Sequence, residues 1–141
     1  MTIQLIEENN AVQENINLDN YSLNKQIVSH SDEVIALNFA AQHQPEIIVL
    51  NYGICHLETP TFVQFLLQKS PKTKIIIVSK MLPEEQLLTC LISGASGYID
   101  ETANQGLKIL HKAIDSVFNH EVWITRKMTA MLLDRLRNQY N

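Results

Sequence analysis

The chain has 141 residues, of which 45% are hydrophobic and 18% charged, and its formal net charge is −4. This length and composition fit one compact domain with a single core. The net negative charge disfavours direct binding to nucleic acid or to anionic membrane surfaces. No apolar run approaches the ~18–20 residues that cross a bilayer, and the first residues lack the layout of a signal peptide, so we expect a cytoplasmic protein without a membrane partner. The two cysteines, Cys55 and Cys90, form neither a disulfide framework nor a metal-ligand pattern, and we interpret both as packing residues.

Short apolar segments, partly β-branched, recur five times along the chain. Their composition is typical of strands that are buried on both faces of a parallel sheet. The five predicted strands are Ile3–Ile6, Gln26–Ser29, Ile47–Leu50, Lys74–Ser79 and Tyr98–Ile99.

Segments with helical spacing of apolar residues lie between these strands. The first predicted helix, Asn10–Tyr21, is rich in Asn, and Ser31 is the predicted N-cap of the second. Thr59-Pro60 and Pro83 mark two further helix starts. Five strands alternating with helices predict an α/β fold with a doubly wound, five-stranded parallel sheet of the flavodoxin or CheY type. In such folds, sites lie at the carboxyl ends of the strands.

Polar residues follow the predicted strands at that edge of the sheet. Two later motifs accompany them, Gly94-Ala95-Ser96-Gly97-Tyr98-Ile99 and Glu121-Val122-Trp123. The ordered set resembles a response-regulator receiver domain of the LuxR (NarL-like) type. The resemblance spans about Ile3 to His120, which suggests a receiver-like domain over residues 1–120 and a C-terminal extension over residues 121–141 that contains an extra helix.

The resemblance implies a role for each position at the strand ends. In that family two acids hold Mg²⁺, an aspartate accepts a phosphoryl group, a hydroxyl contacts it and a lysine pairs with it. In this chain the corresponding residues are Glu7 and Glu8 for the acids, Asn51 for the acceptor, Ser79 for the hydroxyl and Glu101 for the lysine.

Two of these positions have lost the group that the chemistry requires. The amide oxygen of Asn51 is neutral and yields no stable acyl phosphate. Glu101 is an anion in place of the cation that neutralises phosphoryl charge. We therefore expect a pseudo-receiver, a regulatory domain that acts through protein contacts without being phosphorylated. Lys80, directly after Ser79, is interpreted as solvated rather than as a counter-ion of these acids.

The altered pocket leaves a second class of function open, that of a small-molecule or metal sensor. Glu7, Glu8 and Asn51 carry the oxygen ligands that hard cations prefer, but an empty, hydrated pocket is the favoured interpretation, so neither a metal nor a cofactor is predicted. An enzymatic function is not expected, because no Gly-x-Ser-x-Gly elbow surrounds Ser79 and no phosphate-binding glycine loop opens a helix.

The extension contains a predicted helix with one apolar stripe. Thr125 is its predicted N-cap, and the stripe consists of Met128, Met131, Leu132 and Leu136. Such a stripe packs against the domain's own surface, against a second copy of the chain, or against another domain. We expect self-association as a homodimer or binding to another protein. In LuxR-type regulators a helix-turn-helix domain follows this region, so nucleic acid would be bound only through a domain outside these 141 residues.

Overall fold

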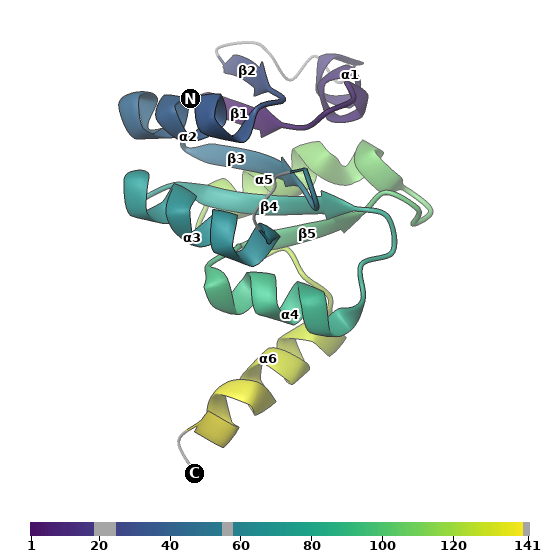
Figure 1. Ribbon diagram of the computed structural model, residues 1–141. Coiled ribbons are helices and arrows are strands. Elements are labelled where there is room, and N and C mark those ends of the chain that lie inside the picture. Colours follow the sequence, from purple (N-terminus) through teal and green to yellow (C-terminus); the bar gives the residue numbers. More distant parts are fainter. Residues whose placement is uncertain (19–24, 55–57, 140–141) are drawn as a thin grey trace.

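The computed structural model describes residues 1–18, 25–54 and 58–139, which form a parallel five-stranded sheet surrounded by helices (Figure 1). The strands are β1 (Thr2–Ile6), β2 (Gln26–His30), β3 (Ile47–Asn51), β4 (Lys74–Ser79) and β5 (Gly97–Asp100). Their order across the sheet is β2-β1-β3-β4-β5. The predicted fold class is confirmed, and each predicted strand agrees with the structure to within one residue at either end.

In the described part of the chain, four helices connect successive strands, and two more follow the last strand. They are α1 (Ala11–Leu18), α2 (Glu33–His43), α3 (Thr59–Lys69), α4 (Glu84–Ser93), α5 (Leu110–Phe118), which a short 3-10 turn η1 (Gly106–Ile109) precedes, and α6 (Arg126–Gln139). The first helix begins one residue later than predicted, and part of the predicted range lies outside the described residues.

The N-cap of α2 corrects the prediction by one residue. Asp32, not Ser31, has the extended backbone of a cap, and its carboxylate accepts a hydrogen bond from the Ile35 N–H at 2.9 Å. A carboxylate at this position satisfies a free N–H group and also complements the positive end of the helix dipole. Ser and Asp both favour the N-cap position, so the sequence alone does not show which of these two adjacent residues caps α2.

The sheet separates two apolar clusters, one on each face. Ile48 and Leu50 of β3 face α2, α3 and α4, whereas Ile47 and Val49 of the same strand face α1 and α5. Side chains alternate between the two faces of a strand, so a strand covered on both sides is apolar throughout. This burial accounts for the continuous apolar runs from which the strands were predicted. Cys90 is also fully buried, as predicted, while Cys55 lies outside the described residues.

The extension first pairs with the edge of the sheet and then packs on α4. The Trp123 N–H donates to the Ser96 carbonyl at 3.0 Å, and the Trp123 carbonyl accepts from the Tyr98 N–H at 3.0 Å. Gly97 permits this approach, because a Cβ atom there would lie 3.1 Å from the Cβ of Trp123. Thr125 then caps α6 as predicted, since its hydroxyl accepts from the Met128 N–H at 3.1 Å. The extra C-terminal helix is therefore present and crosses α4 (Figure 1).

None of the helices in the described part of the chain is both long and apolar enough to cross a membrane.

Candidate functional site

The backbone brings the predicted site residues to one edge of the sheet. Glu7 directly follows β1, whose last residue pairs with Leu50, so Glu7 lies level with Asn51 at the end of β3. Ser79 ends β4, and its carbonyl accepts a hydrogen bond from the Glu101 N–H at 2.9 Å. The carboxyl ends of β1, β3, β4 and β5 are therefore adjacent. The side chains at these positions, however, point to different partners.

Glu7 serves as a helix cap and is buried. Its two carboxylate oxygens accept hydrogen bonds from the N–H groups of Val12 and Gln13, both at 3.0 Å, at the start of α1. Burial raises the pKa of Glu7 above its ordinary value, the two backbone hydrogen bonds oppose this, and the negative charges of Glu101 and Glu14 add to the rise. The structure thus ties the first residue of the acid pair to the backbone, where both oxygens already have partners.

Glu8, in contrast to the buried Glu7, is exposed. Together with Asn51 it lines a hollow of about 110 Å³, whose remaining lining residues come from the neighbouring loops and are Asn9, Tyr52, Gly53 and Ile54. Of the five predicted positions, the structure therefore brings Glu8 and Asn51 together at one cavity. Glu7, Ser79 and Glu101 do not line it.

The residues at this edge do not fit the Mg²⁺ set that the receiver resemblance implies. Both oxygens of Glu7 are engaged by α1, and Asn51 supplies a neutral amide in place of a carboxylate. Within residues 1–18, 25–54 and 58–139, no three His, Cys, Asp or Glu side chains are grouped closely enough to hold a metal ion. We therefore derive no chemistry through a metal at this edge.

The β4 and β5 positions also lack the contacts of a phosphoryl site. Within the described part of the chain, the Ser79 hydroxyl has one hydrogen-bond partner, the neighbouring Lys80 carbonyl, and the distance of 3.4 Å is near the limit of a hydrogen bond. Glu101 is half-buried, and its negative charge contributes to the raised pKa of Glu7. Lys80 is exposed and forms no ion pair with a described residue, in line with the prediction that it is solvated.

Asp100 and Tyr98 are residues at this edge to which the sequence analysis gave no role. The Asp100 Oδ1 accepts hydrogen bonds from the Thr102 hydroxyl at 2.6 Å, from the Thr102 N–H at 2.8 Å and from the Met81 N–H at 3.3 Å. The Tyr98 hydroxyl accepts from the Leu82 N–H at 3.2 Å. The Asp-x-Thr spacing is a known turn signal that could have indicated the local part of this arrangement. The contact with the β4–α4 loop has no such signal.

The apolar stripe predicted on α6 is buried in the chain's own core at one end and partly exposed to solvent at the other. Met128 is buried and belongs to the cluster that contains Leu87, Leu88 and Leu91 of α4; Met131 and Leu132 pack partly against the same cluster. Leu136, the last member, is 39% exposed. Two ion pairs border this contact, Lys127 with Glu84 at 2.7 Å and Arg135 with Glu85 at 3.0 Å.

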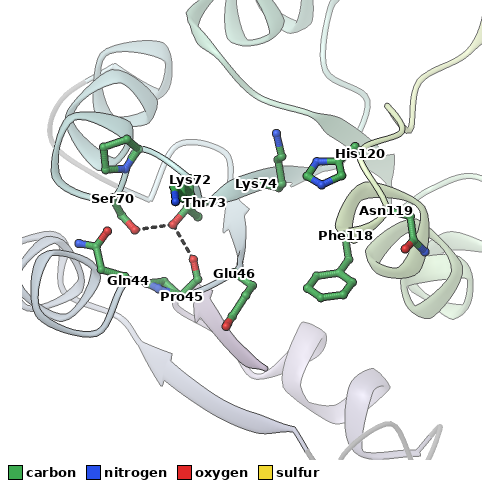
Figure 2. A pocket seen from close by; sticks show the side chains of 11 residues that line it. Gln44, Pro45, Glu46, Ser70, Lys72, Thr73, Lys74, Phe118, Asn119 and His120 are labelled. Atoms are coloured by element: carbon green, nitrogen blue, oxygen red, sulfur yellow. Dashed lines mark hydrogen bonds between the residues drawn. The ribbon is translucent and has the colours of Figure 1, made fainter.

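A larger cavity, of about 810 Å³, lies at the opposite end of the sheet (Figure 2). Helices α2, α3 and α5 all end near it, and Lys72 and Lys74 are among the residues that line it. The buried Thr73 hydroxyl lies 2.5 Å from both the Ser70 hydroxyl and the Pro45 carbonyl, which satisfies these groups internally. None of the predicted site residues lines this cavity, and its features are explained by the fold.

Comparison with known proteins identifies proteins that are similar to this chain in sequence or in fold. No protein-family model matches the chain. The chain is 30% identical over 122 residues to the oxygen regulatory protein NreC of Staphylococcus epidermidis, an alignment covering 85% of this chain and 55% of NreC. The chain thus spans about half the length of the curated relatives it matches.

Solved structures agree on the fold. A LuxR-family two-component response regulator from Aurantimonas sp. SI85-9A1 has a TM-score of 0.77 at 17% identity, covering 95% of this chain and 96% of that chain. A CheY-like response regulator receiver domain protein from Methanospirillum hungatei JF-1 has a TM-score of 0.70 at 14% identity, covering 84% and 94% respectively.

The strand order and these comparisons together show the CheY-like fold of response-regulator receiver domains. By sequence, the chain is similar to the part of NreC that the alignment covers.

Proposed function

We propose that this receiver domain signals without aspartyl phosphorylation, as a non-enzymatic pseudo-receiver that acts in the cytoplasm through protein contacts. The observation that carries the proposal is Asn51 at the end of β3, where the family has its phosphoryl acceptor. An amide oxygen carries no full negative charge and does not attack phosphorus as a carboxylate does.

The charges around Asn51 support the same proposal. A usual receiver site, with three acids and one lysine, has a formal charge of −2, whereas Glu7, Glu8 and Glu101 sum to −3. Glu101 is half-buried, so its charge is less screened by water than that of an exposed side chain. A phosphoryl dianion would therefore meet net repulsion where the family provides a cation.

Acetyl phosphate with Mg²⁺, followed by intact mass measurement, tests this proposal. We expect the wild-type chain to gain no phosphoryl mass of about 80 Da, and an adduct at the strand ends would overturn the proposal. Asn51→Asp restores the acceptor but leaves Glu101 in the lysine position, so we expect labelling of this variant to be poor or undetectable. Adding Glu101→Lys to Asn51→Asp is expected to raise labelling by at least about tenfold, which corresponds to ~1.4 kcal/mol of transition-state stabilisation.

A matched pair of variants sharpens this experiment. Glu101→Lys alone keeps Asn51 and is expected to stay unlabelled, which shows that the cation does not act without the acceptor. Strong labelling of Asn51→Asp alone would show that Glu101 does not disable the site, and would limit the proposal to Asn51.

The alternative of a small-molecule sensor at this edge has less support. The hollow beside Glu8 and Asn51, about 110 Å³, is below the ~300–1,000 Å³ of typical ligand pockets and is suited to a few water molecules. A metal sensor is disfavoured by the hydrogen bonds that occupy Glu7. Thermal-shift measurements with divalent metals and polar metabolites would revive this alternative if one of them raised the melting temperature by several degrees.

We further propose that the output is self-association, with the chain acting as the receiver part of a transcriptional regulator whose DNA-binding domain lies outside these residues. The support is the set of LuxR-type relatives, of which this chain spans about half. Sedimentation across a range of concentrations, with and without acetyl phosphate, is the measurement. A dimer indifferent to acetyl phosphate is expected, and a monomer at all concentrations would exclude the homodimer.

A further inference from the structure

The loop between β4 and α4, residues 80–83, is attached to β5 at two consecutive backbone groups. The Met81 N–H donates to the Asp100 carboxylate at 3.3 Å, and the Leu82 N–H donates to the Tyr98 hydroxyl at 3.2 Å. Both acceptors belong to β5, the strand next to β4 in the sheet. The loop therefore takes its position from side chains of β5.

Asp100 is itself held in place for this contact. The hydroxyl and N–H of Thr102 both donate to the same oxygen, Oδ1, that accepts from Met81. These hydrogen bonds from Thr102 are the main reason that the pKa of Asp100 lies below its ordinary value, so the carboxylate is charged at neutral pH. A charged acceptor makes stronger hydrogen bonds than a neutral one.

Met81 adopts a backbone conformation that is uncommon for a residue with a side chain. Its φ angle is +44°, in the left-handed region that residues with a Cβ atom seldom adopt without support. The side chain does not provide it, because Met81 is 76% exposed, the most exposed of the large apolar residues in the described part of the chain. The hydrogen bond from the Met81 N–H to Asp100 provides the support.

The former phosphorylation site contributes little to this loop. In a phosphorylated receiver the phosphoryl group reaches the end of β4 through the hydroxyl at the position of Ser79. Here that hydroxyl lies 3.4 Å from the Lys80 carbonyl. The side-chain partners of the loop N–H groups of Met81 and Leu82 are instead Asp100 and Tyr98 of β5.

We propose that Asp100 is a positioning residue that holds the β4–α4 loop in one fixed arrangement, in place of the phosphoryl group of an ordinary receiver. This inference rests on the proposed phosphorylation-independent function and names how the same edge of the sheet is controlled. The loop leads directly into α4, whose first residues, Glu84 and Glu85, form the ion pairs with α6. Asp100 thereby fixes the start of the helix on which the extension packs.

Amide exchange measured by NMR on the 141-residue chain tests the proposal. In Asp100→Ala we expect the Met81 and Thr102 amides to exchange about tenfold faster than in the wild type, as loss of a hydrogen bond to a charged group implies. The Leu82 amide, bonded to Tyr98, is expected to change less. Asp100→Asn keeps an oxygen acceptor at the same place and is expected to restore most of the protection at Met81.

The matched control is Asp134→Ala, which removes an exposed carboxylate whose recorded ion pair is with Arg137 on the same helix. It should leave the Met81 amide unchanged. The proposal is overturned if Met81 exchange in Asp100→Ala stays within twofold of the wild type. It is equally overturned if all amides of the sheet accelerate together, because this would reveal a general loss of stability.

The amide-exchange experiment and the intact-mass measurement after acetyl phosphate together separate the two proposals. A phosphoryl adduct on the wild-type chain would overturn the phosphorylation-independent function even if Asp100→Ala releases the loop. An unaltered loop in Asp100→Ala would overturn the role of Asp100. It would not affect the proposal that Asn51 prevents phosphorylation.

Discussion

At the carboxyl edge of the sheet, Glu7 and Asp100 accept hydrogen bonds from backbone N–H groups, whereas between α4 and α6 the main contact is the buried side chain of Met128. The edge contains hydrogen bonds that position loops, and the α4–α6 face contains apolar surface that stabilises the extension. Asn51 and Glu101 lie outside both apolar clusters. The difference teaches that the apolar contacts that maintain the fold and the residues proposed to prevent phosphorylation lie in separate parts of the molecule.

Met128→Ala would test the apolar side of this comparison and has the largest expected effect. Truncating a buried methionine costs about 2–5 kcal/mol, and because α6 lies at the periphery we expect a value near ~2 kcal/mol in urea unfolding. Met81→Ala is the matched control, since Met81 is 76% exposed and its truncation should change stability by less than about 0.5 kcal/mol. Equal stability of the two variants would contradict the role assigned to Met128.

Glu7→Gln would test the polar side through its pH dependence. The folded protein raises the pKa of Glu7 above 4.5, so the folded state binds this proton more tightly than the unfolded state does. The resulting stabilisation is fully present below pH 4.5 and is lost as the pH rises through the folded value. The free energy of unfolding of the wild type should therefore contain a component that decreases above pH 4.5.

The difference between the pH profiles of the wild type and Glu7→Gln isolates that component, because every other titrating group is common to both proteins. Glu8→Gln serves as the control, since it alters the adjacent but exposed carboxylate. A difference profile that is flat for Glu7→Gln, or that has the same slope for Glu8→Gln, would show that the burial of Glu7 does not govern its titration.

Glu85→Gln would have the smallest effect on stability. It would show how little the ion pairs that border the α4–α6 contact contribute to the free energy of unfolding. Arg135 Nη2 lies 3.0 Å from both oxygens of Glu85, but both side chains are largely exposed. We expect a loss below about 1 kcal/mol that shrinks further in ~1 M salt. A loss as large as that of Met128→Ala would mean that charge, not burial, stabilises the extension.

The strands were predictable because β3 and β4 are covered on both faces and are therefore apolar throughout. The orientation of Glu7 was not predictable, since adjacent glutamates are equivalent in sequence and the position at which α1 begins decides which of them caps it. The contact of Asp100 with Met81 joins residues 19 positions apart, and its two partners carry no shared motif.

The stripe on α6 shows the same limit. Helical spacing identified Met128 and Leu136 as members of one apolar face, but the position of α4 determines that the first is buried and the second is 39% exposed.

The joint between the sheet and the extension also has an optical consequence. The chain contains one tryptophan, Trp123, whose backbone bonds to the residues on either side of Gly97. Because the chain has no second tryptophan, its tryptophan emission reports only on the place where the extension pairs with β5. Release of the extension into water would shift that emission to longer wavelength, so the wild-type chain carries its own fluorescent reporter of whether α6 is docked.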